Sequence, residues 1–184
     1  MTISLFVFIA IAVLIVSIGL LYNALVSKSQ MVNNAWADID VQLKRRSNLI
    51  PQIVSTVKAY AAHEKELFED IVSKRNEALA AGDNTAARGT AESALSPPVS
   101  RLIAIAEDYP DLKANENFLD LQNELSDTEN KIEMARRFYN GAVRELNIAV
   151  RSFPANLLSG AFGFRSANFF EIDLADRKPP EVNL

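Results

Sequence analysis

The sequence predicts an all-α protein in which one N-terminal transmembrane helix carries an antiparallel helical bundle. Three observations support this class: a long uncharged stretch lies near the N-terminus, apolar residues recur at seven-residue spacing along two later segments, and no stretch alternates long enough to form a sheet. We expect the transmembrane helix over residues 1–22, the bundle over 23–172 and a disordered tail over 173–184. The bundle should contain one long kinked helix, two further helices and a short fourth helix.

The uncharged stretch runs from Ile3 to Leu21, and 14 of its 19 residues are Ile, Leu, Val or Phe. At about 1.5 Å of rise per residue it covers roughly 28 Å, close to the thickness of the hydrocarbon core of a bilayer. A cleaved signal peptide is the competing interpretation, but no Lys or Arg precedes the run and residues 22–26 lack a small-x-small cleavage pattern. Basic residues occur only after the span, which favours a bundle on the cytoplasmic side.

One long helix is predicted after the span, because no glycine occurs before Gly82 and Pro51 is the only proline in the interval. Apolar or aromatic residues fall there on two seven-residue registers: Trp36, Leu43, Ile50, Val57 and Ile71 on the first, and Ile39, Ile53, Tyr60 and Leu67 on the second. Such registers indicate a heptad seam. Since the first register runs unbroken past Pro51, we predict a kink there and no chain reversal, with Trp36 in the core.

The remaining helices are delimited by glycine and proline. The cluster from Gly82 to Thr85 predicts a turn, and a second helix should follow over about residues 86–107, distorted by the Ser-Pro-Pro sequence at 96–98. Residues 108–111 predict the second reversal. A third helix is expected over 112–152, because large residues recur by sevens from Phe118 to Phe153, and Pro154 suits the first turn of the short fourth helix.

Composition excludes several classes of function. The net charge of -4 and the pI near 5.1 leave no overall basic field, so we expect no nucleic-acid partner. The chain has no cysteine, which excludes disulfides, thiolate metal sites and a cysteine nucleophile. Neither a G-x-S-x-G elbow nor a phosphate-binding glycine-rich loop is present, so we expect no enzyme and no catalytic residue.

A metal site has one weak candidate, His63 with Glu64 and Glu66. A di-iron bundle uses Glu-x-x-His motifs on two helices, and this chain has a single histidine. We therefore expect no metal and no cofactor, with His63 at the surface or at the end of the bundle.

Charged residues on the seam predict a polar cluster inside the bundle. Arg46 takes a seam position otherwise filled by apolar residues, and Glu129 and Arg136 share one edge of the third predicted helix. Because buried charges need partners, we expect Asp38, Asp40 or Arg46 to contact Glu129 or Arg136. The favoured interpretation is an ion-pair cluster that fixes helix register, and the alternative is a ligand-binding polar pocket.

Aromatic residues concentrate near the C-terminal end of the bundle. Phe162, Phe164, Phe169 and Phe170 lie within nine residues, close to two glycines. Two interpretations stay open: these rings cap the open end of the bundle, which we favour, or they form an interaction patch for a partner.

Several blocks of the sequence resemble the LemA family. They include Tyr22-Asn23 after the span, AWADIDVQLKRRSNLIPQIVSTVKAYAAHE from residue 35, AEDYPDLKANENFLDLQNEL from residue 106, and Phe153-Pro154-Ala155-Asn156. The resemblance covers nearly the whole chain and implies a membrane-anchored bundle of bacterial type, with the N-terminus outside and the domain inside. Two features depart from the family pattern. Ala59 replaces a usual glycine, which should favour helix, and the prolines at 97 and 98 stand where relatives continue a helix.

The expected function is a non-enzymatic scaffold in the bacterial inner membrane. Its partners would be the lipid bilayer and other membrane or cytoplasmic proteins, including copies of itself, because an exposed heptad seam leaves apolar residues in water. The alternative is a bundle that binds a metal or a small ligand through its inward charges. A third possibility is that the same bundle is exported to the opposite side of the membrane.

Overall fold

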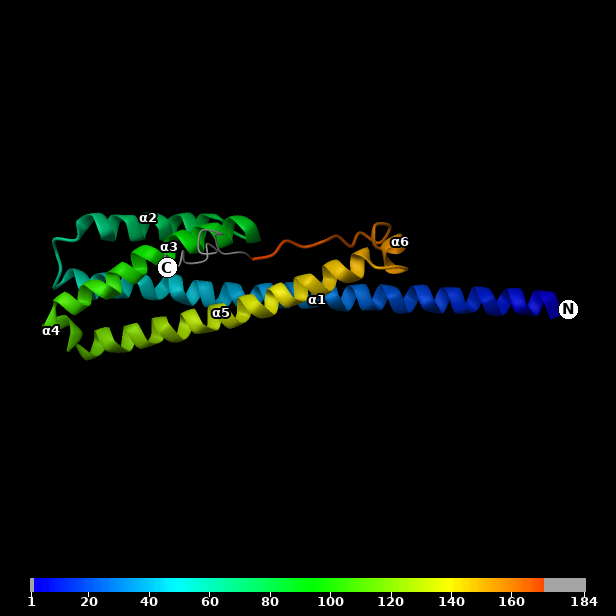
Figure 1. The fold of residues 1–184 in the computed structure, drawn as a ribbon, viewed down its shortest axis with the longest axis horizontal. Helices are drawn as coiled ribbons and strands as arrows, with labels where there is room; N and C mark the ends of the chain where they lie inside the picture. Colours follow the sequence, from blue (N-terminus) through cyan, green and yellow to red (C-terminus); the bar gives the residue numbers. More distant parts are fainter. Residues whose placement is uncertain (1, 171–184) are drawn as a thin grey trace, which may run out of the picture. The chain divides into compact units, whose positions relative to one another are not determined.

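The computed structural model describes residues 2–170 and confirms the all-α class (Figure 1). Its elements are α1 (Thr2–Lys58), α2 (Lys65–Ala80), α3 (Thr85–Ile105), the 3₁₀ turn η1 (Ala106–Asp108), α4 (Pro110–Lys113), α5 (Glu116–Arg151) and α6 (Ala155–Ser159). No strand occurs within residues 2–170. The tail predicted over 173–184 lies outside the described residues.

Helix α1 continues without interruption from the apolar N-terminal stretch through Pro51. It is long and apolar enough to cross a membrane, and none of its most apolar stretch is buried inside the protein. The prediction that Pro51 does not reverse the chain is confirmed, since the proline lies inside the helix with an exposed ring.

The prediction of helix beyond Lys58 is wrong, because the chain turns over residues 59–64 and α2 returns along α1. The side-chain Nε of Arg75 donates to the carbonyl oxygen of Ser47 at 2.7 Å, which places α2 antiparallel to α1. The heptad spacing wrongly indicated one continuous helix, because the apolar residues of α1 and α2 happen to be separated by multiples of seven across the turn. Ala59 lies in this turn directly after α1, so the expectation that it favours helix is also wrong.

Prolines have different effects in the next two elements. Helix α3 is continuous over Thr85–Ile105 although Pro97 and Pro98 lie inside it. The predicted reversal at 108–111 is present: Tyr109 is extended, with φ -121° and ψ 90°, and Pro110 begins α4. The third predicted helix is divided at Ala114–Asn115, where the Asn115 side chain accepts a hydrogen bond from the Phe118 amide at 3.0 Å and caps α5.

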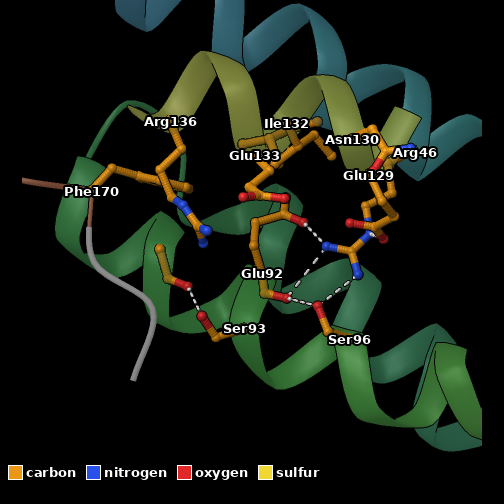
Figure 2. Close-up of a pocket in the computed structure, with 12 residues that line it drawn as sticks. Arg46, Glu92, Ser93, Ser96, Glu129, Asn130, Ile132, Glu133, Arg136 and Phe170 are labelled. Carbon is orange, nitrogen blue, oxygen red and sulfur yellow. Dashed lines mark hydrogen bonds and ion pairs between the residues drawn. The ribbon is translucent and has the colours of Figure 1, made fainter. Parts of the chain in front are cut away.

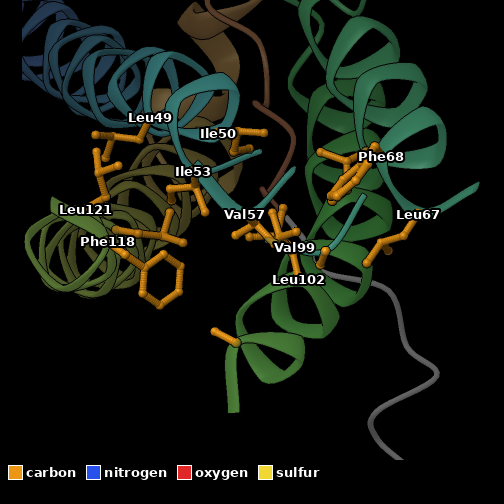
Figure 3. Packing of buried hydrophobic residues seen from close by; sticks show 14 of the residues in the cluster. Leu49, Ile50, Ile53, Val57, Leu67, Phe68, Val99, Leu102, Phe118 and Leu121 are labelled. Carbon is orange, nitrogen blue, oxygen red and sulfur yellow. The ribbon is translucent and has the colours of Figure 1, made fainter. Parts of the chain in front are cut away.

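The chain forms two compact units that share α1 and α5. Within the described residues, the first unit comprises 2–38 and 137–167, and the second comprises 39–136 and 168–170. The core of the second unit gathers side chains from α1, α2, α3 and α5 (Figure 3). Its buried apolar members are Leu49, Ile50, Ile53, Val57, Ala61, Leu67, Phe68, Ile71, Leu95, Val99, Leu102, Ala106, Leu112, Phe118, Leu121 and Leu125.

The first unit is an antiparallel pairing of α1 residues 22–38 with α5 residues 137–151. The rings of Trp36 and Tyr139 lie 5.6 Å apart, and Lys28 Nζ is 3.1 Å from a carboxylate oxygen of Glu145. Trp36 is half-buried, while Tyr139 is fully buried. The segment after α6 is tied back to α5, because the Asn147 amide both donates to the Ala167 carbonyl and accepts from its N–H, at 3.0 and 2.8 Å.

Candidate functional site

A polar cavity of about 250 Å³ lies inside the second unit, where faces of α1, α3 and α5 meet (Figure 2). Helical spacing brings its lining residues together, because side chains three or four positions apart share one face. The lining consists of Leu43 and Arg46 from α1, Gly89, Glu92, Ser93 and Ser96 from α3, Glu129, Asn130, Ile132, Glu133 and Arg136 from α5, and Phe170.

Arg46 is the centre of the charged network in this unit. Its side chain is only 3% exposed, yet its guanidinium has partners on two helices. One Nη lies 3.3 Å from a carboxylate oxygen of Glu92, the other donates to the Ser96 hydroxyl at 2.9 Å, and Nε is 2.9 Å from a Glu129 carboxylate oxygen (Figure 2). The Nε contact is an ion pair without aligned hydrogen-bond geometry. One buried cation therefore links α1 to both α3 and α5.

A second buried arginine shares the same carboxylate. Arg88 Nε donates to the other Glu92 oxygen at 3.0 Å, one helical turn away on α3. One Nη of Arg88 lies 4.0 Å from Asp40 and has no hydrogen-bond partner within residues 2–170. Glu92 is thus held between two guanidiniums. This arrangement compensates buried charge, as the low-dielectric interior requires.

Glu92 is a buried carboxyl whose pKa is raised above the usual value of 4.5. Burial is the largest cause, because removal from water disfavours the ionised form. The positive charges of Arg46 and Arg88 and the Arg88 hydrogen bond act in the opposite direction, while the nearby Glu129 adds to the rise. The two arginines therefore offset the cost of burying this carboxylate only in part.

The sequence-predicted polar residues do not all belong to this network. Arg46 and Glu129 form an ion pair, and Asp40 approaches Arg88 and pairs with Lys44 at 2.6 Å. Arg136 is half-buried and lines the cavity, as Figure 2 shows. Asp38 is exposed and belongs to the first unit.

Sequence reasoning missed Arg88 and Glu92, the two residues that complete the buried network. Both precede Leu95, Val99 and Leu102 at alternating spacings of four and three, so they take positions on the buried stripe of α3. This spacing was the available signal. A charged pair one helical turn apart, in line with an apolar stripe, indicates a paired interior charge rather than a solvated face.

The four phenylalanines are divided between the two units. Phe162 and Phe164 in the first unit pack edge-on against Tyr22, with ring centres 5.1 and 5.7 Å apart. Phe170 is buried and lines the cavity of the second unit, while Phe169 is exposed. His63 is exposed in the turn after α1, and residues 2–170 contain no cluster of three or more acidic or histidine side chains that could hold a metal ion.

Fold and site together define a class: a membrane-associated helical bundle with an apolar N-terminal helix and a charged interior. The chain belongs to the LemA family, whose family model matches residues 35–184. The resemblance seen in the sequence is thereby confirmed.

Curated relatives include three magnetosome proteins. The chain is similar to MamQ 1 and MamQ 2 of Paramagnetospirillum magneticum, each 24% identical over 175 residues and aligned with 82% of this chain. MamQ of Magnetospirillum gryphiswaldense is 24% identical over 174 residues, aligned with 81% of this chain. The chain spans 64% of the length of these relatives.

Proposed function

We propose that this protein is a non-enzymatic scaffold anchored in the bacterial inner membrane by a single span, with its bundle in the cytoplasm. The bundle would bind other membrane or cytoplasmic proteins, copies of itself included. The similarity to three magnetosome proteins, of whose length the chain spans 64%, is consistent with this proposal.

The observation that carries this proposal is the set of large apolar side chains that α5 leaves in water. Phe138 is 55% exposed and Ile148 is 53% exposed, and both lie on the same side of the helix in the first unit. Large exposed apolar residues that share one helix face are typical of protein-interaction surfaces. We name Phe138 and Ile148 the α5 apolar face.

The interior of the bundle supports a structural role for its charges. Arg46, Arg88 and Glu92 form ion pairs with one another and with Glu129 and Asp40, and Arg46 also donates to the Ser96 hydroxyl. A network of this kind fixes the register of α1, α3 and α5 and leaves the outer surfaces for recognition.

Site-specific photo-cross-linking of the full-length protein in its native membrane tests the scaffold. A photoreactive phenylalanine analogue at Phe138 should yield discrete cross-linked bands, which mass spectrometry then assigns to this chain or to another protein. The matched control places the same analogue at Val72 on α2, which is 49% exposed but belongs to the second unit. Equal yields at the two positions, or none at either, would remove the support for the α5 apolar face.

Membrane topology has its own test. Because the chain has no cysteine, Val72→Cys introduces a single thiol. A membrane-impermeant maleimide should label this thiol only after the inner membrane is opened. Labelling of intact spheroplasts would place the bundle outside the cytoplasm and overturn the proposed orientation.

A second candidate function is the binding of a small polar ligand, favoured by the 250 Å³ cavity. Its lining offers the half-buried Arg136 together with the carboxylates of Glu92 and Glu133 and the hydroxyl of Ser93. Mass spectrometry of the purified protein under non-denaturing conditions, with metal analysis, distinguishes this function from the scaffold. A stoichiometric adduct or metal that is lost in Arg136→Gln would favour the ligand-binding bundle.

A further inference from the structure

The C-terminal end of α5 lies level with the point where the apolar stretch of α1 ends. In the first unit Trp36 faces Tyr139, and Lys28 faces Glu145. Extending this antiparallel pairing along both helices places Ser152 at the level of Tyr22, the residue that follows the apolar run. The chain after α5 therefore begins where a spanning helix would leave the bilayer.

The segment 152–164 is held against that exit point. Tyr22 packs edge-on against Phe162 and Phe164, at 5.1 and 5.7 Å between ring centres, and Figure 1 shows α6 beside α1. Tyrosine is enriched at membrane–water interfaces, because its ring is apolar and its hydroxyl is polar. The aromatic contact thus holds the segment at the level of Tyr22, which would be interfacial depth for a spanning α1.

This segment has one buried side and one exposed apolar side. Ala155 and Ser159 are buried, and the Ser159 hydroxyl donates to the Val150 carbonyl at 3.3 Å. Leu157 lies on the opposite side of α6 and is 69% exposed, and Phe153 just before it is 80% exposed. Phe153 is the most exposed aromatic residue beyond the apolar run within residues 2–170. Water is an unfavourable environment for both side chains.

The charges around the segment have one sign. No acidic residue occurs between Glu145 and Glu171, whereas Arg151 and Arg165 are both exposed. Glu145 itself pairs with Lys28. Exposed apolar side chains flanked by arginines match the boundary between the headgroups and acyl chains of an anionic leaflet.

We propose that α6 and its flanks, residues 151–165, form a second membrane anchor that lies in the interface of an anionic leaflet. Phe153 and Leu157 enter the boundary of the acyl chains, while Arg151 and Arg165 contact lipid phosphates. The inference rests on the span in the proposed function, since the end of that span defines the depth of the surface. With the span and α6 both held, the first unit has two attachments to the bilayer.

Electron paramagnetic resonance on full-length protein tests this second anchor. Single cysteines replace Ile11 in the span, Leu157 in α6 and Val72 in α2, and each carries a nitroxide label in vesicles of phosphatidylcholine with or without phosphatidylglycerol. The ratio of collisions with oxygen to collisions with a water-soluble nickel complex reports immersion. We expect immersion at 11 and 157 but not at 72, with the label at 157 deeper when phosphatidylglycerol is present.

The three positions separate the ways in which the inference fails. A water-accessible label at position 11 would overturn the span itself, and with it the proposed anchorage. An immersed label at 11 with a water-accessible label at 157 would overturn the second anchor alone. Dipolar broadening between labels at 157 would assign this surface to a second copy of the chain. Equal depth in both lipid mixtures, or no change in Arg151→Gln/Arg165→Gln, would overturn the preference for anionic lipid.

Discussion

The two units of this protein differ in what they keep from water. The second unit buries a continuous apolar cluster and three charged residues, Arg46, Arg88 and Glu92. The first unit buries no charged residue within the described chain and leaves Phe138, Ile148 and other large apolar side chains exposed. Both units use the same two long helices.

This difference indicates two physical roles along the same helices. The second unit closes its own core with four helices, as a water-soluble domain does. The first unit has only two long helices and a short one, so its outer apolar side chains have no further helix to cover them. Stability should therefore reside in the second unit, whereas contacts with lipid and protein should reside in the first.

A matched pair of phenylalanines on α5 gives the largest expected contrast. Phe118 is 1% exposed in the core of the second unit, and Phe138 is 55% exposed in the first. Phe118→Ala should lower the free energy of unfolding by about 3–5 kcal/mol, because it removes apolar contacts and leaves a cavity. Phe138→Ala should change it by less than about 0.5 kcal/mol. Denaturant unfolding in mild detergent, followed by far-ultraviolet circular dichroism, measures both, and similar losses would contradict the division of roles.

Two adjacent arginines on α1 provide the next contrast. Arg46→Gln removes a buried cation and leaves Glu92 and Glu129 without a partner on α1, so it should destabilise the protein by about 3 kcal/mol. Arg45 pairs with Glu124 at 3.0 Å, but both side chains are about 40% exposed. Arg45→Gln should cost no more than about 0.5 kcal/mol, since solvent screens such a pair. The same unfolding experiment decides, and equal costs would mean that the interior network contributes little.

Glu92→Gln should have a smaller effect on stability than the Arg46 substitution, and the effect should appear in the pH dependence of unfolding. Because the folded pKa of Glu92 is raised, the folded protein retains its proton when the unfolded chain releases it. Stability contributed by this group is therefore complete below pH 4.5 and is lost as pH rises from 4.5 through the raised pKa. Glu92→Gln cannot lose a proton and should lack this loss. Unfolding midpoints measured across the acid range test the sign.

Asp127 provides a control of opposite sign for the pH experiment. A hydrogen bond from Lys131 lowers the pKa of Asp127 below 3.8, so its contribution is present above that pH and is lost as pH falls. Asp127→Asn should therefore abolish the decrease in stability that protonation of Asp127 causes at acid pH. A variant of Glu92 that behaved like this one would show that burial does not dominate at Glu92.

Much of the fold followed from apolar periodicity and proline position. The long apolar N-terminal helix, its continuation through Pro51 and the reversal before Pro110 are local properties of the sequence, and all are visible in residue spacing. The reversal after Lys58 was not, because it contains neither proline nor glycine and keeps the heptad count. It depends instead on the packing of α2 against α1. The spacing of apolar residues along the sequence does not reveal this tertiary contact.

The site was predictable only in part, for a related reason. Arg46 stood out because it interrupts an apolar register, and its pairing with Glu129 joins two strongly periodic helices. Arg88 and Glu92 lie on α3, where prolines and small residues weaken the pattern. Their burial depends on the way α3 packs between its neighbours, so their spacing alone did not identify them as partners of Arg46.

The long separation between paired residues has a consequence for biosynthesis. Lys28 and Glu145 are 117 residues apart, so at about 5–20 residues per second the ribosome makes the second roughly 6–23 s after the first. The N-terminal half of the first unit is therefore synthesised well before the part of α5 that pairs with it. Under the proposed anchorage, insertion of the apolar helix would hold residues 22–38 near the bilayer surface during this interval, until α5 completes the unit.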